Sequence, residues 1–181
     1  MCFGQKRSYR RVWYSDFMSV LDVVSSRRSI RRYEDKEIPE DVMDQIVEAG
    51  RQAPSAANRQ PYRFVIVTNT ELKKAISGLF SSFVKNAPVV IVGCANPKAL
   101  LTGKWSTIDT AIALENMVLA AWSLGVGSCW IGSFDEEKVK CSLIIPQDWK
   151  VIALVCFGYP AETPKQRKRK AAAELFSMNQ F

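Results

Sequence analysis

The chain has 181 residues, 48% of them hydrophobic, and carries 25 Lys and Arg against 18 Asp and Glu, a formal net charge of +7. This length and composition fit one globular domain and exclude a disordered chain. The sequence contains no histidine. That excludes His-based catalytic triads, His metal sites and imidazole proton transfer, so catalysis must come from a cofactor or from other side chains.

The cysteines and the apolar segments indicate a cytoplasmic protein. The five cysteines form no Cys-x-x-Cys pair, and Cys94 and Cys156 lie in apolar runs, as small hydrophobic residues do in a reduced, intracellular setting. Residues 1–17 are basic and aromatic without a continuous apolar stretch, so we expect no secretory signal. They form an N-terminal extension, either a docking arm or residues upstream of a start at Met18. No membrane span or membrane partner is expected.

The first half of the chain alternates helices and strands. The pattern predicts a helix over 18–26 and a second over 39–52, which starts with a proline and two acidic residues and ends before Pro54. A strand is predicted over 62–68. An amphipathic helix follows over 71–82, with these side chains inward: Leu72, Ile76, Leu79, Phe80 and Phe83.

The second half adds more strands and the longest helix. Residues 88–95 are almost all apolar and predict a strand covered on both faces. The helix over 106–124 is apolar around most of its circumference, which indicates burial inside the fold or in a subunit interface. Ser106 and Asp109 are spaced as in a capping arrangement, and Gly125 suits the helix C-terminus. A strand over 128–131, a helix over 135–143 and a strand over 151–159 complete a mixed α+β (α/β) fold with about four strands.

Two polar segments do not fit a core. Residues 27–33 hold four arginines and Ser29, and a guanidinium cluster of this density favours an anion such as phosphate or carboxylate. Residues 54–61 offer amide and hydroxyl groups that could bind the edge of a heteroaromatic ring. From their residues alone, segment 27–33 could equally be a basic surface turn or a nucleic-acid contact. Segment 54–61 could equally be a plain connector between a helix and a strand. There is no GxGxxG after a strand and no GxxxxGK[ST], so neither a Rossmann site nor a P-loop is expected.

The two segments together resemble the nitroreductase family, whose members carry Arg-x-Ser-x-Arg/Lys and then Pro-Ser-x-x-Asn-x-Gln-Pro. The resemblance covers roughly residues 18–176. It implies a three-layer sandwich in which helices flank a central, mainly antiparallel sheet, assembled as an intertwined homodimer. Residues 18–181 would form a single FMN-binding domain with a basic C-terminal tail.

The resemblance also implies a site. Arg27 and Ser29 would hold the phosphate and ribityl end of FMN, with Arg28 contributing through its side chain or its backbone. Arg31 would lie near the pyrimidine edge of the flavin, and the 54–60 loop would lie over the flavin, often from the partner subunit. The turn after the strand at 128–131 would lie against the reactive side of the flavin, and arginines of the basic tail would help to neutralise the phosphate. The site residues are Arg27, Arg28, Ser29, Arg31, Pro54, Ser55, Asn58, Gln60, Ile131, Gly132, Ser133, Arg167 and Arg169, with no metal ligand and no catalytic side chain.

The expected function is that of an FMN-dependent oxidoreductase. It would take hydride from NADH or NADPH and reduce a small electron acceptor, such as a nitroaromatic or a quinone, by a ping-pong mechanism. One alternative is a flavoenzyme of the same fold with other chemistry: dehalogenation, flavin breakdown or dehydrogenation. The other is a module that binds nucleic acid through its basic tail. Our interpretation includes no nucleic-acid partner.

Overall fold

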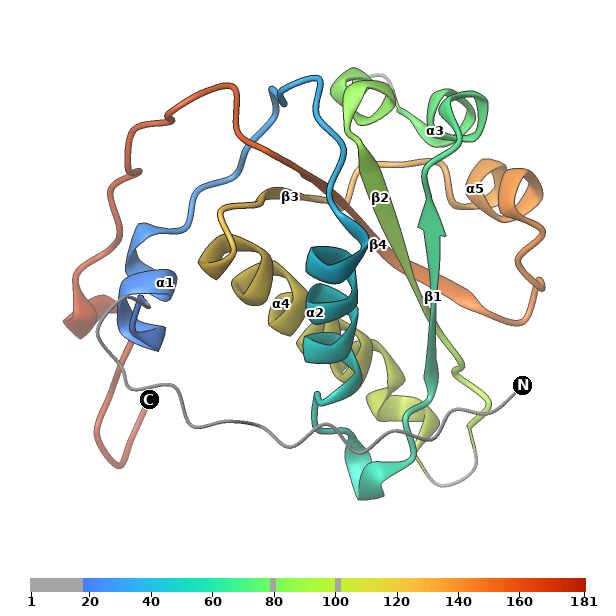
Figure 1. Ribbon diagram of the computed structural model, residues 1–181. Coiled ribbons are helices and arrows are strands. Elements are labelled where there is room, and N and C mark those ends of the chain that lie inside the picture. Colours follow the sequence, from blue (N-terminus) through green and yellow to red (C-terminus); the bar gives the residue numbers. More distant parts are fainter. Residues whose placement is uncertain (1–17, 79–80, 100–101) are drawn as a thin grey trace, which may run out of the picture.

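In the part of the chain that the structure describes, the sheet has four strands, all antiparallel. The computed structural model describes residues 18–78, 81–99 and 102–181 (Figure 1), so the expected extension at 1–17 lies outside the described residues. The strand order is β1 (Tyr62–Val67), β2 (Val89–Ala95), β4 (Lys150–Gly158) and β3 (Gly127–Ile131). The expected α+β class and the number of strands are confirmed.

Two helices cover one face of the sheet, α2 (Glu40–Arg51) and α4 (Ser106–Ser123). Val89 and Ile91 of β2 point to this face and pack with Ile46 of α2 and with the buried stripe of α4. Burying an aliphatic side chain of this size contributes about 1.5–3 kcal/mol. This cluster fixes α4 in the middle of the molecule.

The opposite face is covered by α3 (Thr70–Ile76), α5 (Glu136–Leu143) and a short 3₁₀ segment. The alternate residues of β2, Val90 and Val92, pack there with Ile76 of α3 and Val139 of α5. Because both faces are covered, every residue of β2 is buried, as its apolar run predicts. The result is a sandwich of three layers.

The helix expected over 71–82 is shorter than predicted. It ends at Ile76, and a 3₁₀ segment follows over Ser82–Asn86. Leu72, expected to face inward, is 38% exposed, whereas Lys73 is buried and donates from Nζ to the carbonyl of Ala87 at 2.7 Å. Hydrophobic periodicity does not predict that a lysine side chain is buried because it donates to a buried carbonyl. Leu79 and Phe80 lie outside the described residues.

The arginine-rich segment follows α1 (Val20–Ser26) and runs along the outer edge of β3. The indole nitrogen of Trp122, near the end of α4, donates to Ser26 Oγ at 2.9 Å and joins α1 to α4. Ser29 then forms a parallel bridge with Ser128, and the Ile30 N–H donates to the Ser128 carbonyl at 2.9 Å. These contacts place residues 27–31 beside the strand that ends in the expected ligand-binding turn.

The predicted capping arrangement at the start of α4 is wrong. Ser106 is the first helical residue, and its hydroxyl donates to the Gly103 carbonyl at 2.7 Å instead of capping the helix. Asp109 accepts a hydrogen bond from the distant Ala56 N–H. The predicted role of Gly125 at the C-terminus of α4 is confirmed, because Gly125 has φ +76°, a conformation that glycine adopts without strain.

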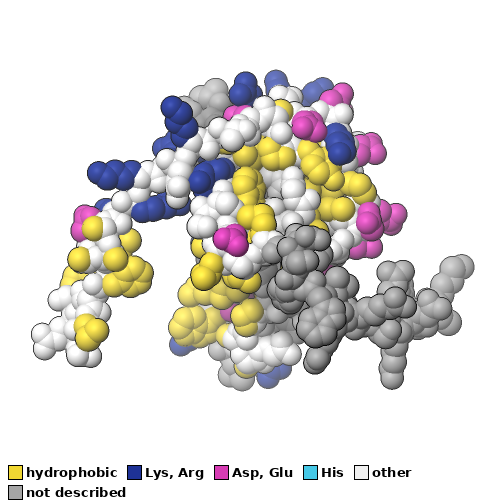
Figure 2. All heavy atoms as spheres, turned by 60° about the vertical axis from the view of Figure 1, so that its left-hand side comes forward, with side chains coloured by type: hydrophobic (Ala, Val, Ile, Leu, Met, Phe, Trp, Pro, Cys, Tyr) yellow, Lys and Arg dark blue, Asp and Glu magenta, His cyan; other side chains and the backbone are white. Residues whose placement is uncertain are grey.

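The tail after β4 first lies beside the arginine-rich segment and then extends away from the body (Figures 1 and 2). An antiparallel bridge joins Tyr33 to Pro160. Residues 171–181 are all exposed, and Figure 2 shows hydrophobic side chains at the end of this arm. In the described part of the chain, no helix combines the length and the apolar character needed to cross a bilayer.

Candidate functional site

A cavity of about 700 Å³ lies between the end of α1, the arginine-rich segment and the tail. Its size falls within the range of about 300–1,000 Å³ that small-molecule sites occupy. Five arginines and one lysine stand among its eleven lining residues. These are Val24, Ser25, Arg27, Arg28, Ser29, Arg31, Pro164, Lys165, Gln166, Arg167 and Arg169.

The cavity unites two segments that are more than a hundred residues apart in the chain. Six predicted site residues line it together: Arg27, Arg28, Ser29, Arg31, Arg167 and Arg169. Guanidinium groups offer forked N–H donors that match phosphate oxygens, so this set of donors fits a phosphorylated ligand. Sequence reasoning did not assign Lys165 or Gln166 to the site.

Glu162 holds the tail against the arginine-rich segment. Its Oε1 accepts from the backbone N–H of Arg31 at 2.6 Å and of Arg32 at 3.1 Å, and Arg32 Nε lies 3.3 Å from Oε2. The hydrogen bond from the Arg31 backbone is the main cause that holds the pKa of Glu162 below its usual value. A charged Glu162 therefore keeps the basic tail beside the cavity.

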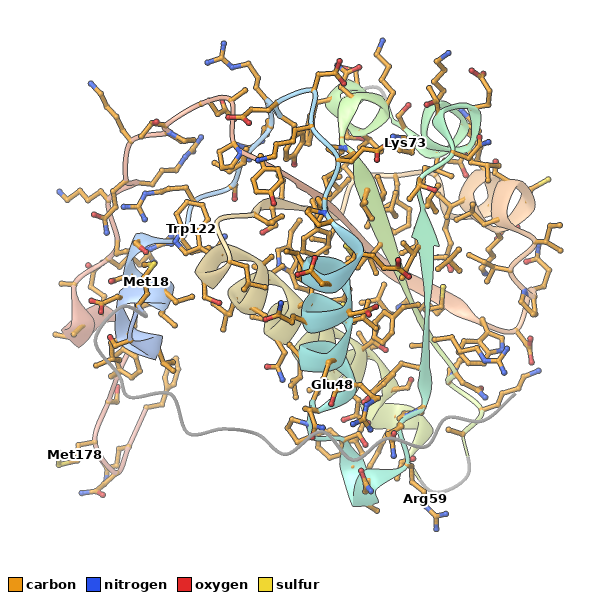
Figure 3. All side chains as sticks on the ribbon, in the orientation of Figure 1. Met18, Glu48, Arg59, Lys73, Trp122 and Met178 are labelled. Carbon is orange, nitrogen blue, oxygen red and sulfur yellow. The ribbon has the colours of Figure 1, made fainter. Side chains whose placement is uncertain are left out.

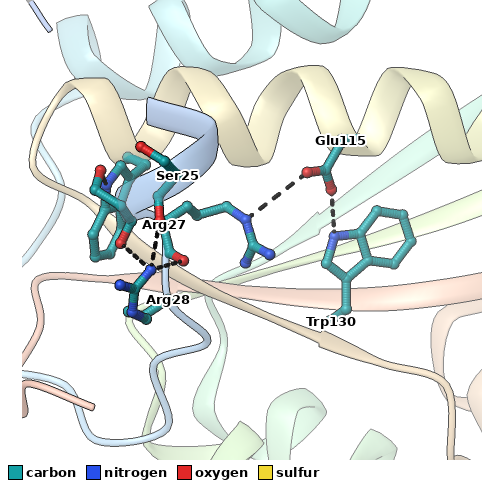
Figure 4. Close-up of polar contacts among 7 residues, drawn as sticks. Ser25, Arg27, Arg28, Glu115 and Trp130 are labelled. Atoms are coloured by element: carbon teal, nitrogen blue, oxygen red, sulfur yellow. Dashed lines mark hydrogen bonds and ion pairs between the residues drawn. The ribbon is translucent and has the colours of Figure 1, made fainter. Parts of the chain in front are cut away.

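Arg28 has a structural task at the end of α1. Its Nη1 donates to the carbonyls of Ser25, Ser26 and Arg27 at 2.8–2.9 Å (Figure 4). These carbonyls are at the helix C-terminus, where partners within the helix are missing. Arg28 thus fixes the turn from which the neighbouring Arg27 projects.

Glu115, inside the apolar helix α4, joins two parts of the site (Figure 4). Its Oε2 accepts a hydrogen bond from the indole nitrogen of Trp130 at 3.0 Å, and its Oε1 lies 3.9 Å from Arg27 Nε. Sequence reasoning gave Glu115 no role, although a carboxylate in an apolar helix was the available signal. It links the arginine-rich segment to β3.

The turn after β3 has a buried start and an open end. Ile131 is buried in the face that packs on α5, whereas Gly132 and Ser133 are exposed. A Cβ added at Gly132 would meet nothing within 4 Å, so the backbone there is open to a ligand.

Cys129, one strand position before Trp130, is buried. Burial raises the pKa of its thiol, although the positive charges of Arg31 and Arg27 oppose that shift. Because the net pKa is raised, the thiol is a poor nucleophile.

The 54–60 loop has an unusual backbone. Ala57, Asn58 and Gln60 have φ of 50°, 54° and 49°, in the left-handed region that residues with a Cβ seldom adopt. Ser55 Oγ accepts from the Gln60 N–H at 3.0 Å, and the Gln60 amide donates to the Asn58 carbonyl at 3.1 Å. Pro54 and Asn58 are exposed. Such strain is concentrated at functional sites, where the surrounding structure maintains it.

One chain does not bring this loop to the arginine-lined cavity. The loop is bonded to Asp109 in the first turn of α4, and α1 is bonded to Trp122 at the other end. Those two positions are thirteen residues apart, or about 20 Å at 1.5 Å per helical residue. Figure 3 shows Trp122 and Arg59 of the loop toward opposite ends of α4. In the described residues, no group of three or more Cys, Asp and Glu could hold a metal ion.

The nitroreductase family profile matches residues 24–159 of this chain. The chain belongs to the nitroreductase family. It is therefore an enzyme of the group whose members are named NAD(P)H nitroreductases and FMN reductases. A relative from Methanothermobacter thermautotrophicus, named as an NADH dehydrogenase/NAD(P)H nitroreductase, is 36% identical over 157 residues, which cover 83% of this chain and 82% of the relative.

Solved structures of nitroreductase-type proteins have the same fold. A nitroreductase family protein from Clostridium novyi NT is 37% identical with a TM-score of 0.74, over 83% of this chain and 89% of that one. The NADPH:FMN oxidoreductase from Vibrio harveyi, solved in complex with NAD⁺, is 26% identical with a TM-score of 0.80, over 90% and 77% of the two chains. The expected family and the sandwich of helices around an antiparallel sheet are confirmed.

Proposed function

We propose that this nitroreductase binds FMN in the arginine-lined cavity, takes hydride from NADH or NADPH and reduces nitroaromatics, quinones or similar electron-poor acceptors. The observation that carries the proposal is the convergence of Arg27, Arg31, Arg167 and Arg169 on one cavity of about 700 Å³. The names of the relatives support it, since one is an NADPH:FMN oxidoreductase in complex with NAD⁺. A cytoplasmic location remains part of the proposal.

Each end of the cofactor has matching residues. Arg27, Arg167 and Arg169 neutralise a phosphate of nearly two negative charges, and the Ser29 hydroxyl can donate a hydrogen bond to it. The parallel bridge between Ser29 and Ser128 directs the chain along β3, so Arg31 lies on the way to the open Gly132–Ser133 turn. There Arg31 stabilises negative charge on the ring, and the exposed backbone of the turn leaves room for it.

Bound FMN supplies the hydride-accepting ring and stores electrons between two substrates that use one site in turn. The residues of the chain bind and orient it. No side-chain nucleophile is required, and the absence of histidine is consistent with this division of work.

We further propose that the enzyme is a homodimer with an intertwined tail. Because the positions of α4 that hold the 54–60 loop and α1 lie about 20 Å apart along the helix, a second chain is needed to bring a loop to each cavity. Exposed apolar side chains also call for a partner, on α1 (Val20, Leu21) and on the tail (Phe176, Met178), which are 75–89% exposed.

The test starts from purified protein. We expect a yellow preparation with one FMN per chain, bleached under anaerobic conditions by NADH or NADPH and recoloured by a quinone. The R27A/R31A variant should lose at least about tenfold in FMN affinity, because each charged hydrogen bond contributes about 1.5–3 kcal/mol.

The matched control is K74A/K98A, which removes two positive charges from exposed ion pairs outside the cavity and should bind FMN normally. Unchanged FMN stoichiometry and affinity in R27A/R31A would overturn the proposal. A colourless protein that binds nucleic acid with strong salt dependence would support the nucleic-acid alternative.

A further inference from the structure

Asp109 is a buried carboxylate bonded to a surface loop. It is 4% exposed, and its two oxygens lie 3.2 and 3.3 Å from the backbone nitrogen of Ala56. Among the described residues, no Lys or Arg lies within 4 Å of it as an ion-pair partner. A carboxylate that accepts from a backbone N–H forms a hydrogen bond stronger than one between neutral groups.

The Ala56 N–H is the point at which the left-handed loop begins. Ala57 and Asn58 follow directly, both with positive φ, and Gln60 closes the loop on Ser55. For residues with a Cβ this backbone is unfavourable, so it persists only where surrounding contacts maintain it. Asp109 provides such a contact from outside the loop, and it does so from α4, a helix fixed in the core.

A second polar group lies buried at the base of the same loop. The hydroxyl of Tyr62 is inaccessible and has no hydrogen-bond partner among the described residues. Burial, and then the negative charge of Asp109, raises the pKa of Tyr62. The carboxylate and the phenol therefore share a poorly solvated space, in which the hydrogen bond to Ala56 is strong.

We propose that Asp109 is a positioning residue that, through the Ala56 N–H, fixes the left-handed loop and so presents Asn58 and Ser55 to the edge of the flavin ring. This inference rests on the proposed function. The family resemblance already implies that the loop lies at the ring end of the cofactor and the arginines at the phosphate end, and the role of Asp109 is the new element. Asn58 can both donate and accept, as a ring edge with N–H and C=O groups requires.

The two ends can be tested separately with FMN, riboflavin and inorganic phosphate as probes. D109A should weaken binding of FMN and of riboflavin by the same factor, about tenfold, since one charge-assisted hydrogen bond is lost. It should leave phosphate binding unchanged. R27A/R167A, which changes only the arginines assigned to the phosphate, should show the opposite pattern, with FMN and phosphate weakened and riboflavin retained.

Two further variants separate positioning from folding. D109N keeps an oxygen acceptor and should bind riboflavin within about threefold of the wild type. A56P removes the backbone N–H at position 56 and leaves the Asp109 carboxylate in place. Proline is compatible there because Ser55, the preceding residue, is extended and residue 56 is the first of a 3₁₀ turn. A56P should reproduce the D109A pattern and settles the matter if D109A does not fold.

Calorimetric titration of the full-length protein gives the three affinities, with the flavin absorption spectrum as a second signature. Equal riboflavin affinity in wild type, D109A and A56P would overturn the inference, as would a parallel loss of phosphate binding in D109A. A wild type that binds none of the flavins would instead refute the proposed function.

Discussion

The indole N–H of Trp130 donates to the carboxylate of Glu115 at 3.0 Å, and this hydrogen bond joins β3 to the longest helix beside the arginine-lined cavity. The other oxygen of Glu115 lies 3.9 Å from Arg27 Nε. Glu115 is partly exposed, so the ion pair itself is screened and contributes little to stability. The hydrogen bond to the half-buried indole is the larger contribution.

Variants at this pair should be strongly non-additive. E115A removes the acceptor and should lower the free energy of unfolding by about 1–2 kcal/mol, whereas E115Q keeps an oxygen and should cost about half as much or less. W130F removes the donor, so E115A should cost clearly less in that background. Denaturant unfolding of the four proteins of the E115A and W130F cycle measures the coupling, and additivity within about 0.3 kcal/mol would contradict the assigned contact.

Gly127 should be required for the place of the arginine-rich segment. A Cβ there would lie 2.6 Å from Cγ1 of the buried Ile30 and 3.0 Å from Cγ of the partly buried Pro160. G127A should therefore displace residues 29–31, reduce stability by about 1–3 kcal/mol and weaken FMN binding. G132A is the matched comparison for stability: its Cβ meets nothing within 4 Å, so its melting temperature should stay near that of the wild type. Equal melting temperatures for the two variants would contradict this account.

Local patterns predicted most of the fold because the burial of each element follows its own sequence. The apolar run at 88–95 is a strand covered on both faces, and Gly125 ends α4 in a left-handed conformation. The pattern failed where a polar group found a distant partner. Lys73 is buried on the Ala87 carbonyl, while Leu72 in the same helix is largely outside the core. No periodicity encodes such a long-range pairing.

The candidate site was predictable by segment but not by contact. The motif named Arg27 and Arg31, which line one cavity with Arg167 and Arg169, and it also named the 54–60 loop. Asp109 was interpreted as a helix cap because its spacing from Ser106 suits one. Its partner, Ala56, is fifty-three residues away, and only the folded chain brings the two together.

Glu162 should make stability depend on pH. Its pKa in the folded protein is lowered, chiefly by the Arg31 N–H, so its stabilising effect is complete above the unfolded pKa of about 4.3 and is lost as the pH falls through the lower folded pKa. E162Q should flatten the decline in unfolding free energy from about pH 5 downward. R32A should keep most of the decline, since the backbone donor remains. Parallel curves for E162Q and wild type would contradict this prediction.

Mixed dimers test whether each site draws on two chains. R27A/R31A and N58A homodimers should both bind FMN at least about tenfold more weakly than wild type. In a mixed dimer of the two variants, one site carries all three changes and the other carries none, if the arginines and the loop of a site come from different chains. Such a dimer, isolated by two affinity tags, should bind one FMN with wild-type affinity.

The alternative arrangement gives a distinct result. If the arginines and the loop of one site belonged to the same chain, every site in the mixed dimer would carry a defect and no tight binding would return. The matched control mixes R27A/R31A with K74A/K98A: with unchanged loops, one chain still provides intact arginines, so one tight FMN site should form in either arrangement. Tight binding in this control but not in the N58A mixture would place the loop in the cavity of its own chain, against the separation of about 20 Å along α4.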